Sequence, residues 1–555
     1  MRYRPLPFLL AAILLWTPLG LEAQGVSSGR TFSPFGTAAD RAIDPASLGV
    51  EAQVFLGTIQ AIRDLGFASE PDSVLWEKAL RGLIRELDDP YAAVLTPDQV
   101  RAFEEESTGN YAGIGVQITE LNEVVTITAV FRNTPADRAG LHVGDRIVEV
   151  DGVDARSWTV SDASDRIRGE IGTGVEVTVE RDGMSQPLPH FIEREEVHVP
   201  AVRADMLQGE IGYIHLDRVA RGSAAEVDSV LAELDGSQGL ILDLRGNPGG
   251  YLDESLNLAD LFLERGSVLV TTRARSLRSD GEIQEESAYA RRAARAGDQP
   301  IIVLVNRYSA SASEIVAGAL QDHDRAVVIG ERTFGKGTVQ SVVPLPADYM
   351  IRLTSGEWYT PLGRSLSIPR DREGRITGPD TVERFTSQAG RTLWGGGGVY
   401  PDVNIPPDTL TSLEQEFIQR TIEAEIPLQQ RIQESAFTAA QAVRTDEVPE
   451  RVPDEAFDEL IEGLRTAGIG EQELGGEVQE YLHWRLEVTF FQRLDRLDRE
   501  MLARSRRDPA LARALELLNQ SSTQTELFAL VPAAERPDPP VVQAARDDEV
   551  IDEGR

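Results

Sequence analysis

PIIVLVNRYSASASEIVAGALQDHDRAVVIG occupies residues 300–330 of the chain. An apolar run, a turn with three serines, apolar positions three and four apart, and a second apolar run follow one another. This order predicts a strand, a helix and a strand joined as a crossover between parallel strands. Because the same alternation extends over residues 199–406, we expect a multidomain α/β protein with a largely parallel sheet in its core.

The pattern changes on both sides of this core. Residues 48–106 have helical spacing of apolar residues, and 109–195 contain short runs rich in Val, Ile and Thr that predict a compact β-rich module. Residues 407–535 are helical and highly charged, and 536–555 have the composition of a disordered acidic tail. Within the core, the polar residues 274–297 are expected to form a surface insertion without strands.

Composition excludes several classes of function. A net charge of −36 opposes binding to nucleic acids and to anionic membranes. With no cysteine, the chain has no disulfide, no catalytic thiolate and no cysteine metal site. The six histidines are scattered and form no HExxH motif, which argues against a zinc hydrolase. No metal or organic cofactor is expected.

The first residues read MRYRPLPFLLAAILLWTPLGLEAQG. Arg2 and Arg4 precede an apolar stretch that is short for a spanning helix, so residues 1–24 are interpreted as a secretory signal peptide. An uncleaved membrane anchor is the alternative. We expect an exported protein, periplasmic or extracellular, with no stable membrane span in the mature chain.

Ser311 stands where the helix of the opening stretch begins, and two interpretations of it stay open. Ser311 and Glu314 match a capping box, in which the serine hydroxyl and the glutamate carboxylate satisfy backbone N–H groups. A serine at a helix N-terminus also lies among free N–H groups that stabilise an oxyanion, which suits a nucleophile.

A nucleophilic serine needs a base, and the nearby candidates are His323 and Lys336. Only two of the 55 basic residues are lysines, Lys78 and Lys336. A lysine serves as a base when burial lowers its pKa, whereas arginine keeps its proton. A base at position 336 therefore requires lysine; a chance lysine or a phosphate contact is the alternative, and the rarity of lysine in this chain makes chance less attractive.

A glycine-rich turn, RGNPGG at residues 245–250, connects another predicted strand to a helix. It either donates a backbone N–H to an oxyanion or is a plain turn. Eight motifs then occur in one order along the chain: LDDPYAAVLTPDQ, YAGIGVQI, TPADRAGLHVGDRIVEVDG, IRGEIGTGVEVTV, LILDLRGNPGG, SASASEIVAGALQD, GERTFGKGTVQ and WYTPLGRS. Together they resemble the carboxyl-terminal processing proteases, or tail-specific proteases, over roughly residues 48–405.

The resemblance implies roles for individual residues. Ser311 is the expected nucleophile, Lys336 the general base and Gln340 the residue that orients the lysine. The backbone N–H groups of Gly250 and Ala312 form the oxyanion hole.

Residues 109–195 resemble a PDZ domain, whose carboxylate-binding loop corresponds to Gly113, Ile114, Gly115 and Val116. Successive N–H groups in such a loop hold a terminal carboxylate while a strand edge pairs with the peptide.

The sequence therefore predicts an exported serine endopeptidase that captures free C-terminal tails of proteins or peptides and cleaves them with a Ser/Lys dyad. A catalytically silent peptide-binding scaffold with the same fold is the alternative. The helices after residue 406 are expected to serve packing, a homo-oligomer contact, adaptor binding or a lid. The expected divisions are 1–24 signal peptide, 48–106 helical region, 109–195 PDZ domain, 199–406 protease core, 407–535 helical region and 536–555 tail.

Overall fold

The computed structural model describes residues 49–67, 70–275, 282–378, 383–443 and 448–531. The expected signal peptide and acidic tail lie outside these residues. Within them, no helix combines the length and the apolar character needed to cross a bilayer.

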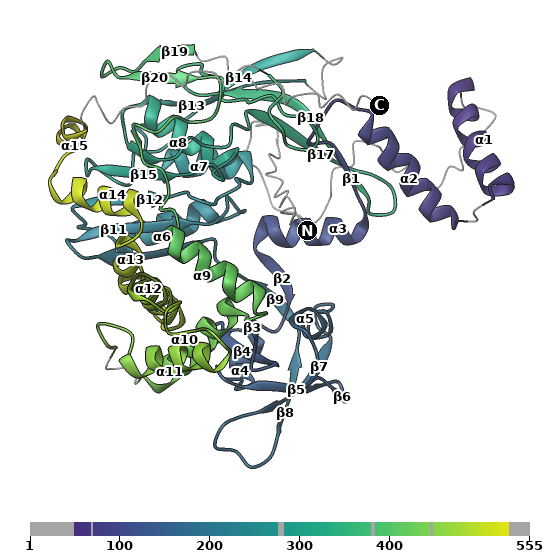
Figure 1. The fold of residues 1–555 in the computed structure, drawn as a ribbon. Coiled ribbons are helices and arrows are strands. Elements are labelled where there is room, and N and C mark those ends of the chain that lie inside the picture. The colour runs from purple at the N-terminus through teal and green to yellow at the C-terminus, as the bar shows by residue number, and fades with distance from the viewer. Residues whose placement is uncertain (1–48, 68–69, 276–281, 379–382, 444–447, 532–555) are drawn as a thin grey trace, which may run out of the picture.

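The core is a six-stranded sheet that is parallel except at one edge (Figure 1). The outermost strand is antiparallel to its neighbour, and every other pair is parallel, which confirms the largely parallel sheet. The strands run in the order β10 (Val202–Leu207), β11 (Ile211–Leu216), β12 (Gly239–Asp243), β15 (Ile301–Val305), β16 (Val327–Gly330) and β21 (Val403–Asn404).

Helices cover both faces of this sheet. Alternate strand residues such as Leu242 and Val303 pack with α6 (Ser223–Glu233), α7 (Leu252–Asp260) and α8 (Ala312–Asp322). The intervening residues, such as Ile241 and Ile302, pack with the C-terminal helices α13 (Leu497–Ser505), α14 (Pro509–Asn519) and α15 (Gln524–Leu530). Burial on two faces explains the uninterrupted apolar runs of these strands. The charged C-terminal region thus supplies one layer of the core.

A second, antiparallel sheet lies beside α8. Its strands are β1 (Ala93–Leu95), β18 (Met350–Tyr359), β13 (Val268–Arg275) and β14 (Ile283–Tyr289), with β17 (Thr338–Pro344) also paired to β18. The expectation of a strandless insertion at 274–297 is wrong, because β14 lies inside it and pairs with β13 along its whole length. β14 is an edge strand with exposed polar side chains, so pairing to its neighbour, and not its own apolar content, makes it a strand.

The β-rich module contains a separate six-stranded sheet with its own buried cluster. The antiparallel pair of β2 (Asn110–Gly113) and β9 (Glu195–His198) carries the chain into and out of it. This arrangement confirms the predicted β-rich domain between the helical region and the core. Its remaining elements are β3 (Val116–Leu121), β4 (Val124–Val130), α4 (Pro135–Arg138), β5 (Arg146–Val150), β6 (Val153–Asp154), α5 (Val160–Ile167), β7 (Gly174–Glu180) and β8 (Leu188–Glu193).

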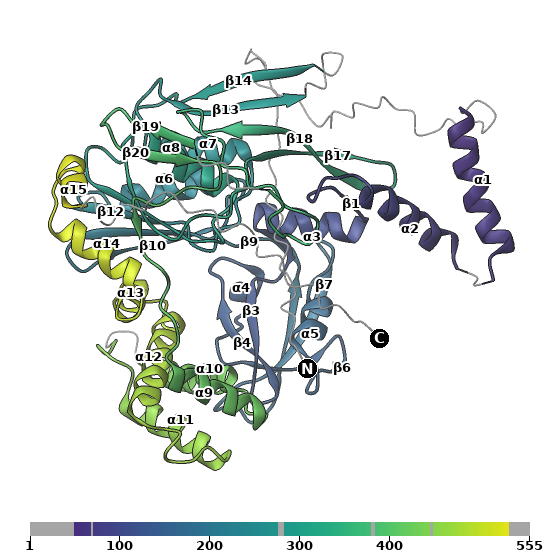
Figure 2. The same cartoon turned by 45° about the horizontal axis from the view of Figure 1, so that its top comes forward.

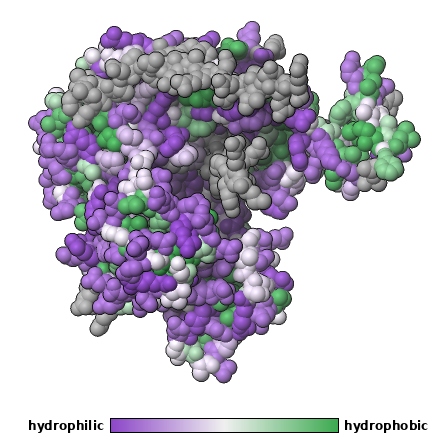
Figure 3. All heavy atoms as spheres, viewed as in Figure 1, coloured by the Kyte–Doolittle hydropathy of each residue, from purple (hydrophilic) through white to green (hydrophobic). Residues whose placement is uncertain are grey.

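The helical ends of the chain differ in their packing. α1 (Val50–Leu65) and α2 (Asp72–Arg85) form a projecting arm (Figure 2). α1 buries none of its residues, and apolar side chains gather on the surface of the arm (Figure 3). The C-terminal helices, in contrast, bury their apolar faces against one another. The other elements are α3 (Pro97–Thr108), β19 (Glu383–Thr386), β20 (Thr392–Gly395), α9 (Ser412–Glu423), α10 (Leu428–Ala442), α11 (Asp454–Thr466) and α12 (Gly476–Arg493).

Candidate active site

The three alternating serines around the start of α8 have different environments. Ser309 Oγ donates to the carbonyl of Leu244 at 2.8 Å, and Ser313 Oγ donates to that of Asn247 at 3.0 Å. Ser311 Oγ is fully buried and has no hydrogen-bond partner among the described residues. Its backbone has φ 56° and ψ −112°, a sparsely populated conformation for a residue with a side chain. The middle serine is therefore the one whose hydroxyl is left available.

The turn RGNPGG packs directly against this serine. The N–H of Ala310 donates to the carbonyl of Asn247 at 3.0 Å. A Cβ at Gly249 would lie 2.6 Å from the Ala310 carbonyl oxygen and 2.8 Å from the Ala312 nitrogen, so only glycine fits there. Gly250 also needs to be glycine, because its φ is 154° and a Cβ would lie 2.0 Å from the carbonyl oxygen of Val219. The structure thus places the turn beside the N-terminus of α8.

Glu314 joins the serine to the lysine loop. Its Oε2 accepts the N–H of Ser311 at 2.7 Å and that of Lys336 at 2.9 Å. Its Oε1 accepts the Gly335 N–H at 2.7 Å and the Thr333 hydroxyl at 2.5 Å. The backbone nitrogens of Ser311 and Lys336 therefore lie within about 6 Å of each other. Only the glutamate half of the expected capping box forms, because Ser311 Oγ makes no hydrogen bond.

Lys336 is buried, with 4% of the residue exposed. Burial, followed by the nearby Arg352, lowers the pKa of Lys336 to about 7, against the opposing effects of Glu314 and Asp89. Its Nζ lies over the ring of Tyr91, 4.6 Å from the centroid. A lysine with this pKa is neutral in a large fraction of molecules at neutral pH, as a general base requires.

Gln340 lies on β17, four residues after the lysine, and is fully buried. Its Nε2 donates to Thr354 Oγ1 at 3.0 Å, while the Thr354 hydroxyl donates to Asp89 Oδ1 at 2.9 Å. This chain fixes the amide with its nitrogen toward Thr354. Gln340 Oε1 has no hydrogen-bond partner within the described part of the chain, so it is free to accept one.

Asp89 and Tyr91 complete the lysine site, and sequence reasoning did not assign them a role. The Arg352 guanidinium donates to the Tyr91 carbonyl at 3.0 Å, and Asp89 Oδ2 accepts the Thr354 N–H at 2.8 Å. These contacts dock the segment onto β18, where the Tyr91 ring covers the amine. Both residues belong to the motif LDDPYAAVLTPDQ, which was the available signal.

His323 is excluded as the base for Ser311. It follows the last turn of α8, whereas Ser311 precedes the first. Eleven helical residues separate them, a distance of about 16 Å along the axis. Its Nε2 instead lies 2.7 Å from the carbonyl oxygen of Val268.

The expected carboxylate loop connects β2 to β3. The carbonyl of Ile114 accepts the Ala136 N–H at 2.8 Å, and that of Gly115 accepts the Phe131 N–H at 3.0 Å. Gly115 has φ 87°, and a Cβ there would overlap Thr134. Both carbonyls are thus held by the domain, in a loop that needs glycine at position 115.

Comparison with known proteins identifies the family. The model of peptidase family S41 matches residues 210–371, and the PDZ domain model matches 102–180. A carboxy-terminal-processing protease of Bartonella bacilliformis is 36% identical over 305 residues, which are 53% of this chain and 68% of that protein. A probable CtpA-like serine protease of Staphylococcus aureus is 34% identical over 302 residues, 54% of this chain and 59% of that protein.

Among solved structures, a photosystem II D1 C-terminal processing protease aligns over 64% of this chain and 93% of its own, with 27% identity and a TM-score of 0.34. The sequence relatives and the family models confirm the resemblance inferred from the motifs. The chain belongs to peptidase family S41 and is a PDZ-containing serine peptidase of the carboxy-terminal-processing type.

Proposed function

We propose that the protein is an exported endopeptidase that recognises the C-terminal tails of protein substrates through its PDZ domain and cleaves them with a Ser311/Lys336 dyad. One observation carries the proposal. A serine hydroxyl without a partner and a buried lysine with a lowered pKa stand on two segments joined by one carboxylate, that of Glu314.

In the first half of the reaction, neutral Lys336 Nζ accepts the proton of Ser311 Oγ as the oxygen attacks the scissile carbonyl carbon. The carbonyl oxygen becomes an oxyanion, and the N–H groups of Gly250 and Ala312 donate to it. When the tetrahedral intermediate collapses, the C–N bond breaks and the Lys336 ammonium returns its proton to the leaving amine. An ester to Ser311 remains.

In the second half, Lys336 accepts a proton from water, and the resulting hydroxide attacks the ester carbonyl. Collapse of this second intermediate breaks the bond to Ser311 Oγ, which regains its proton from Lys336. Gln340 Oε1 accepts a hydrogen bond from the lysine amine and keeps its lone pair directed to the serine. No step needs a metal or an organic cofactor.

Tail recognition is assigned to the PDZ domain. Gly113, Ile114, Gly115 and Val116 supply backbone N–H groups to the terminal carboxylate, and β3 offers an edge for pairing. β3 is the first strand of its sheet path and pairs with β4 on one side. An added peptide strand on the other side is the ordinary mode of such domains.

The direct test compares Ser311→Ala, Lys336→Arg and Lys336→Ala with the wild type on a peptide with a free C-terminal tail. All three variants are expected to lose on the order of 10⁴- to 10⁶-fold in rate. The arginine variant keeps the charge but not the ability to lose a proton. His323→Ala is the matched control and is expected to stay active. Wild-type protein that binds the peptide without cleaving it would instead support the silent scaffold.

Export and assembly need their own measurements. Cell fractionation of the full chain, with N-terminal sequencing of the product, tests removal of residues 1–24 against retention as an anchor. Light scattering tests a homo-oligomer or adaptor role for the C-terminal helices. Their apolar faces are largely covered within the chain, so such a contact would use the residues left exposed, among them Leu413 and Ile422.

A further inference from the structure

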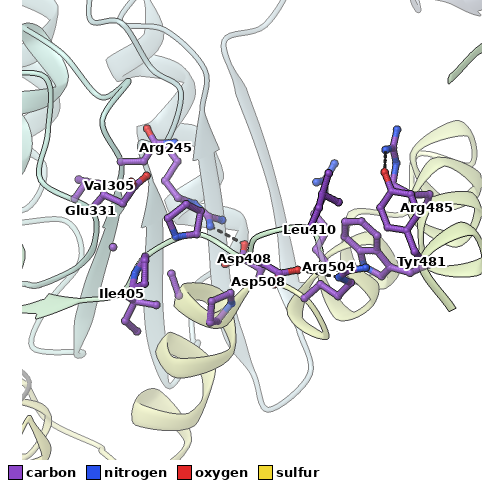
Figure 4. Close-up of a pocket in the computed structure, with 18 residues that line it drawn as sticks. Arg245, Val305, Glu331, Ile405, Asp408, Leu410, Tyr481, Arg485, Arg504 and Asp508 are labelled. Carbon is purple, nitrogen blue, oxygen red and sulfur yellow. Dashed lines mark hydrogen bonds and ion pairs between the residues drawn. The ribbon is translucent and has the colours of Figure 1, made fainter. Parts of the chain in front are cut away.

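A pocket of about 510 Å³ is lined by residues of the protease core and of the C-terminal helices (Figure 4). An ion pair crosses it. Arg245 Nη1, on the turn after β12, lies 2.6 Å from Oδ2 of Asp508, the residue that immediately precedes α14. Neither family model extends beyond residue 371, so Asp508 lies outside the matched regions. The pair links the turn of the candidate oxyanion hole to the C-terminal region.

Arg245 is held between two carboxylates. On the core side its Nε and Nη2 contact Asp243 Oδ1 and Oδ2 at 2.9 and 2.6 Å, and Tyr213 donates its hydroxyl to Asp243 Oδ2 at 2.7 Å. Burial acts to lower the pKa of Arg245, but Asp243 and then Asp508 outweigh it and raise the pKa. The guanidinium is therefore permanently charged and fixed from two sides, one of which belongs to the C-terminal region.

The backbone next to Arg245 carries the contacts that hold the nucleophile loop. The Leu244 carbonyl accepts the Ser309 hydroxyl at 2.8 Å, and the Gly246 N–H donates to Asn306 Oδ1 at 3.0 Å. Three residues after Gly246, Gly249 packs against the backbone around Ser311. The residues that follow and precede Arg245 thus contact the loop that carries Ser311.

We propose that Asp508 is a positioning residue for the peptidase reaction. Through Arg245 it holds the turn 245–250 in its position against the N-terminus of α8. The inference rests on the proposed function, because it assigns the turn to the oxyanion hole. It makes the C-terminal region a support of the catalytic geometry, in addition to a layer of the fold.

Asp508 has a second role that the test must separate. Its Oδ1 accepts the N–H of Leu511 at 3.0 Å and so caps α14. Asparagine and serine are both good N-caps. In Asp508→Asn the single amide oxygen is used by the cap, which turns the NH₂ group toward the guanidinium. In Asp508→Ser the side chain caps the helix but is too short to reach Arg245. Both variants keep the cap and lose the ion pair.

Asp408→Asn is the matched control. Asp408 lines the same pocket and pairs with Arg507 at 2.8 Å, whereas Arg245 pairs with Asp243 and Asp508. Arg507 keeps Glu414 as a second partner. This variant removes one carboxylate from the pocket while leaving the turn untouched.

The experiment measures kcat and KM of the full chain on a tailed peptide, together with hydrogen exchange of residues 246–251 and 511–519. In both Asp508 variants kcat is expected to fall about three- to thirtyfold, with KM within about twofold of the wild type. Exchange should quicken in the turn but not in α14. The pH midpoint of the rate should stay the same, because Lys336 is not touched. Asp408→Asn should leave all these quantities unchanged.

The inference is overturned if either Asp508 variant has the kcat of the wild type and the turn exchanges its amide hydrogens at the wild-type rate. It is equally overturned if Asp408→Asn gives the same loss, or if α14 alone exchanges faster, since Asp508 would then be only a helix cap. If the wild type shows no Ser311-dependent cleavage, the proposed function fails, and exchange of the turn still decides whether Asp508 positions it.

Discussion

Lys336→Met is expected to abolish cleavage while making the protein more stable, with a gain that depends on pH. The substitution replaces the buried amine with an apolar side chain of similar length. In the wild type, burial lowers the pKa of Lys336 from 10.5 to about 7. Each unit of this difference corresponds to about 1.36 kcal/mol of folding free energy, so the charged lysine opposes folding by roughly 5 kcal/mol at most. Attraction of the ammonium to the Tyr91 ring, worth up to about 2 kcal/mol, leaves the expected gain at roughly 3 to 5 kcal/mol.

The sign of the pH dependence follows from proton binding. Below pH of about 7 the lysine holds its proton in both the folded and the unfolded chain, so the variant has its full advantage. Between that pH and the ordinary value of 10.5 the unfolded chain binds a proton that the folded chain does not. The stability of the wild type relative to the variant then rises with pH. Above 10.5 both states are neutral, and this part of the difference vanishes.

Urea unfolding at pH values of about 6, 8 and 10 measures the difference in unfolding free energy between the wild type and Lys336→Met. The unfolding is monitored with a spectroscopic probe in the protease core. Lys78→Met is the matched control for removing an amine, because the Lys78 side chain is 58% exposed. A difference between wild type and Lys336→Met that stays constant from pH of about 6 to 10 would refute the lowered pKa. The general-base assignment of Lys336 would then lose its physical basis.

Three further outcomes are expected. Amidation of a substrate's C-terminus should raise KM by about tenfold or more, because it removes a charge-assisted contact worth roughly 1.5–3 kcal/mol; equal cleavage of acid and amide would argue against the PDZ assignment. Glu314→Gln should lower both kcat and melting temperature, since its NH₂ group would face backbone N–H donors; a differential scan and a rate assay check it. Gly249→Ala should lower kcat at least about 100-fold by pushing the turn away from Ala312. Gly374 also has a positive φ, but a Cβ there would meet no atom within 4 Å, so Gly374→Ala should not change kcat.

Patterns along the chain were sufficient for those parts of the fold that depend on local spacing. The strand–helix–strand pattern at 300–330 predicted β15, α8 and β16, because an apolar run buried on two faces differs clearly from an amphipathic helix. β14 was missed for the opposite reason. An edge strand whose side chains are exposed on both faces needs little apolar content, and it is a strand because it pairs with β13, which no local pattern predicts.

The residues of the candidate active site likewise fall into those that a local motif predicts and those that only the folded structure brings together. Ser311 and Lys336 are visible because each stands in a motif of distinctive composition. Glu314 was visible too, but only as a helix cap, since its contacts with Gly335 and Lys336 cross about twenty residues of chain. Asp89 reaches Thr354 from 265 residues away, so its place in the lysine site follows only from the three-dimensional fold.

The C-terminal region shows why a helical pattern alone does not define a domain. The apolar stripe of α14 predicts that this helix packs against another element. The spacing of the apolar residues is compatible with a second helix and with a sheet, so it does not identify the partner. In the structure Leu511, Leu517 and Leu518 cover the sheet face formed by residues such as Ile241 and Ile302. Removal of everything after residue 405 would expose that apolar face, and we expect the truncated protease core to lose stability, which urea unfolding would measure. The ion pair of Asp508 with Arg245 then places the same layer in contact with the turn beside the nucleophile. One segment thus both covers a face of the core sheet and contacts the turn beside the nucleophile.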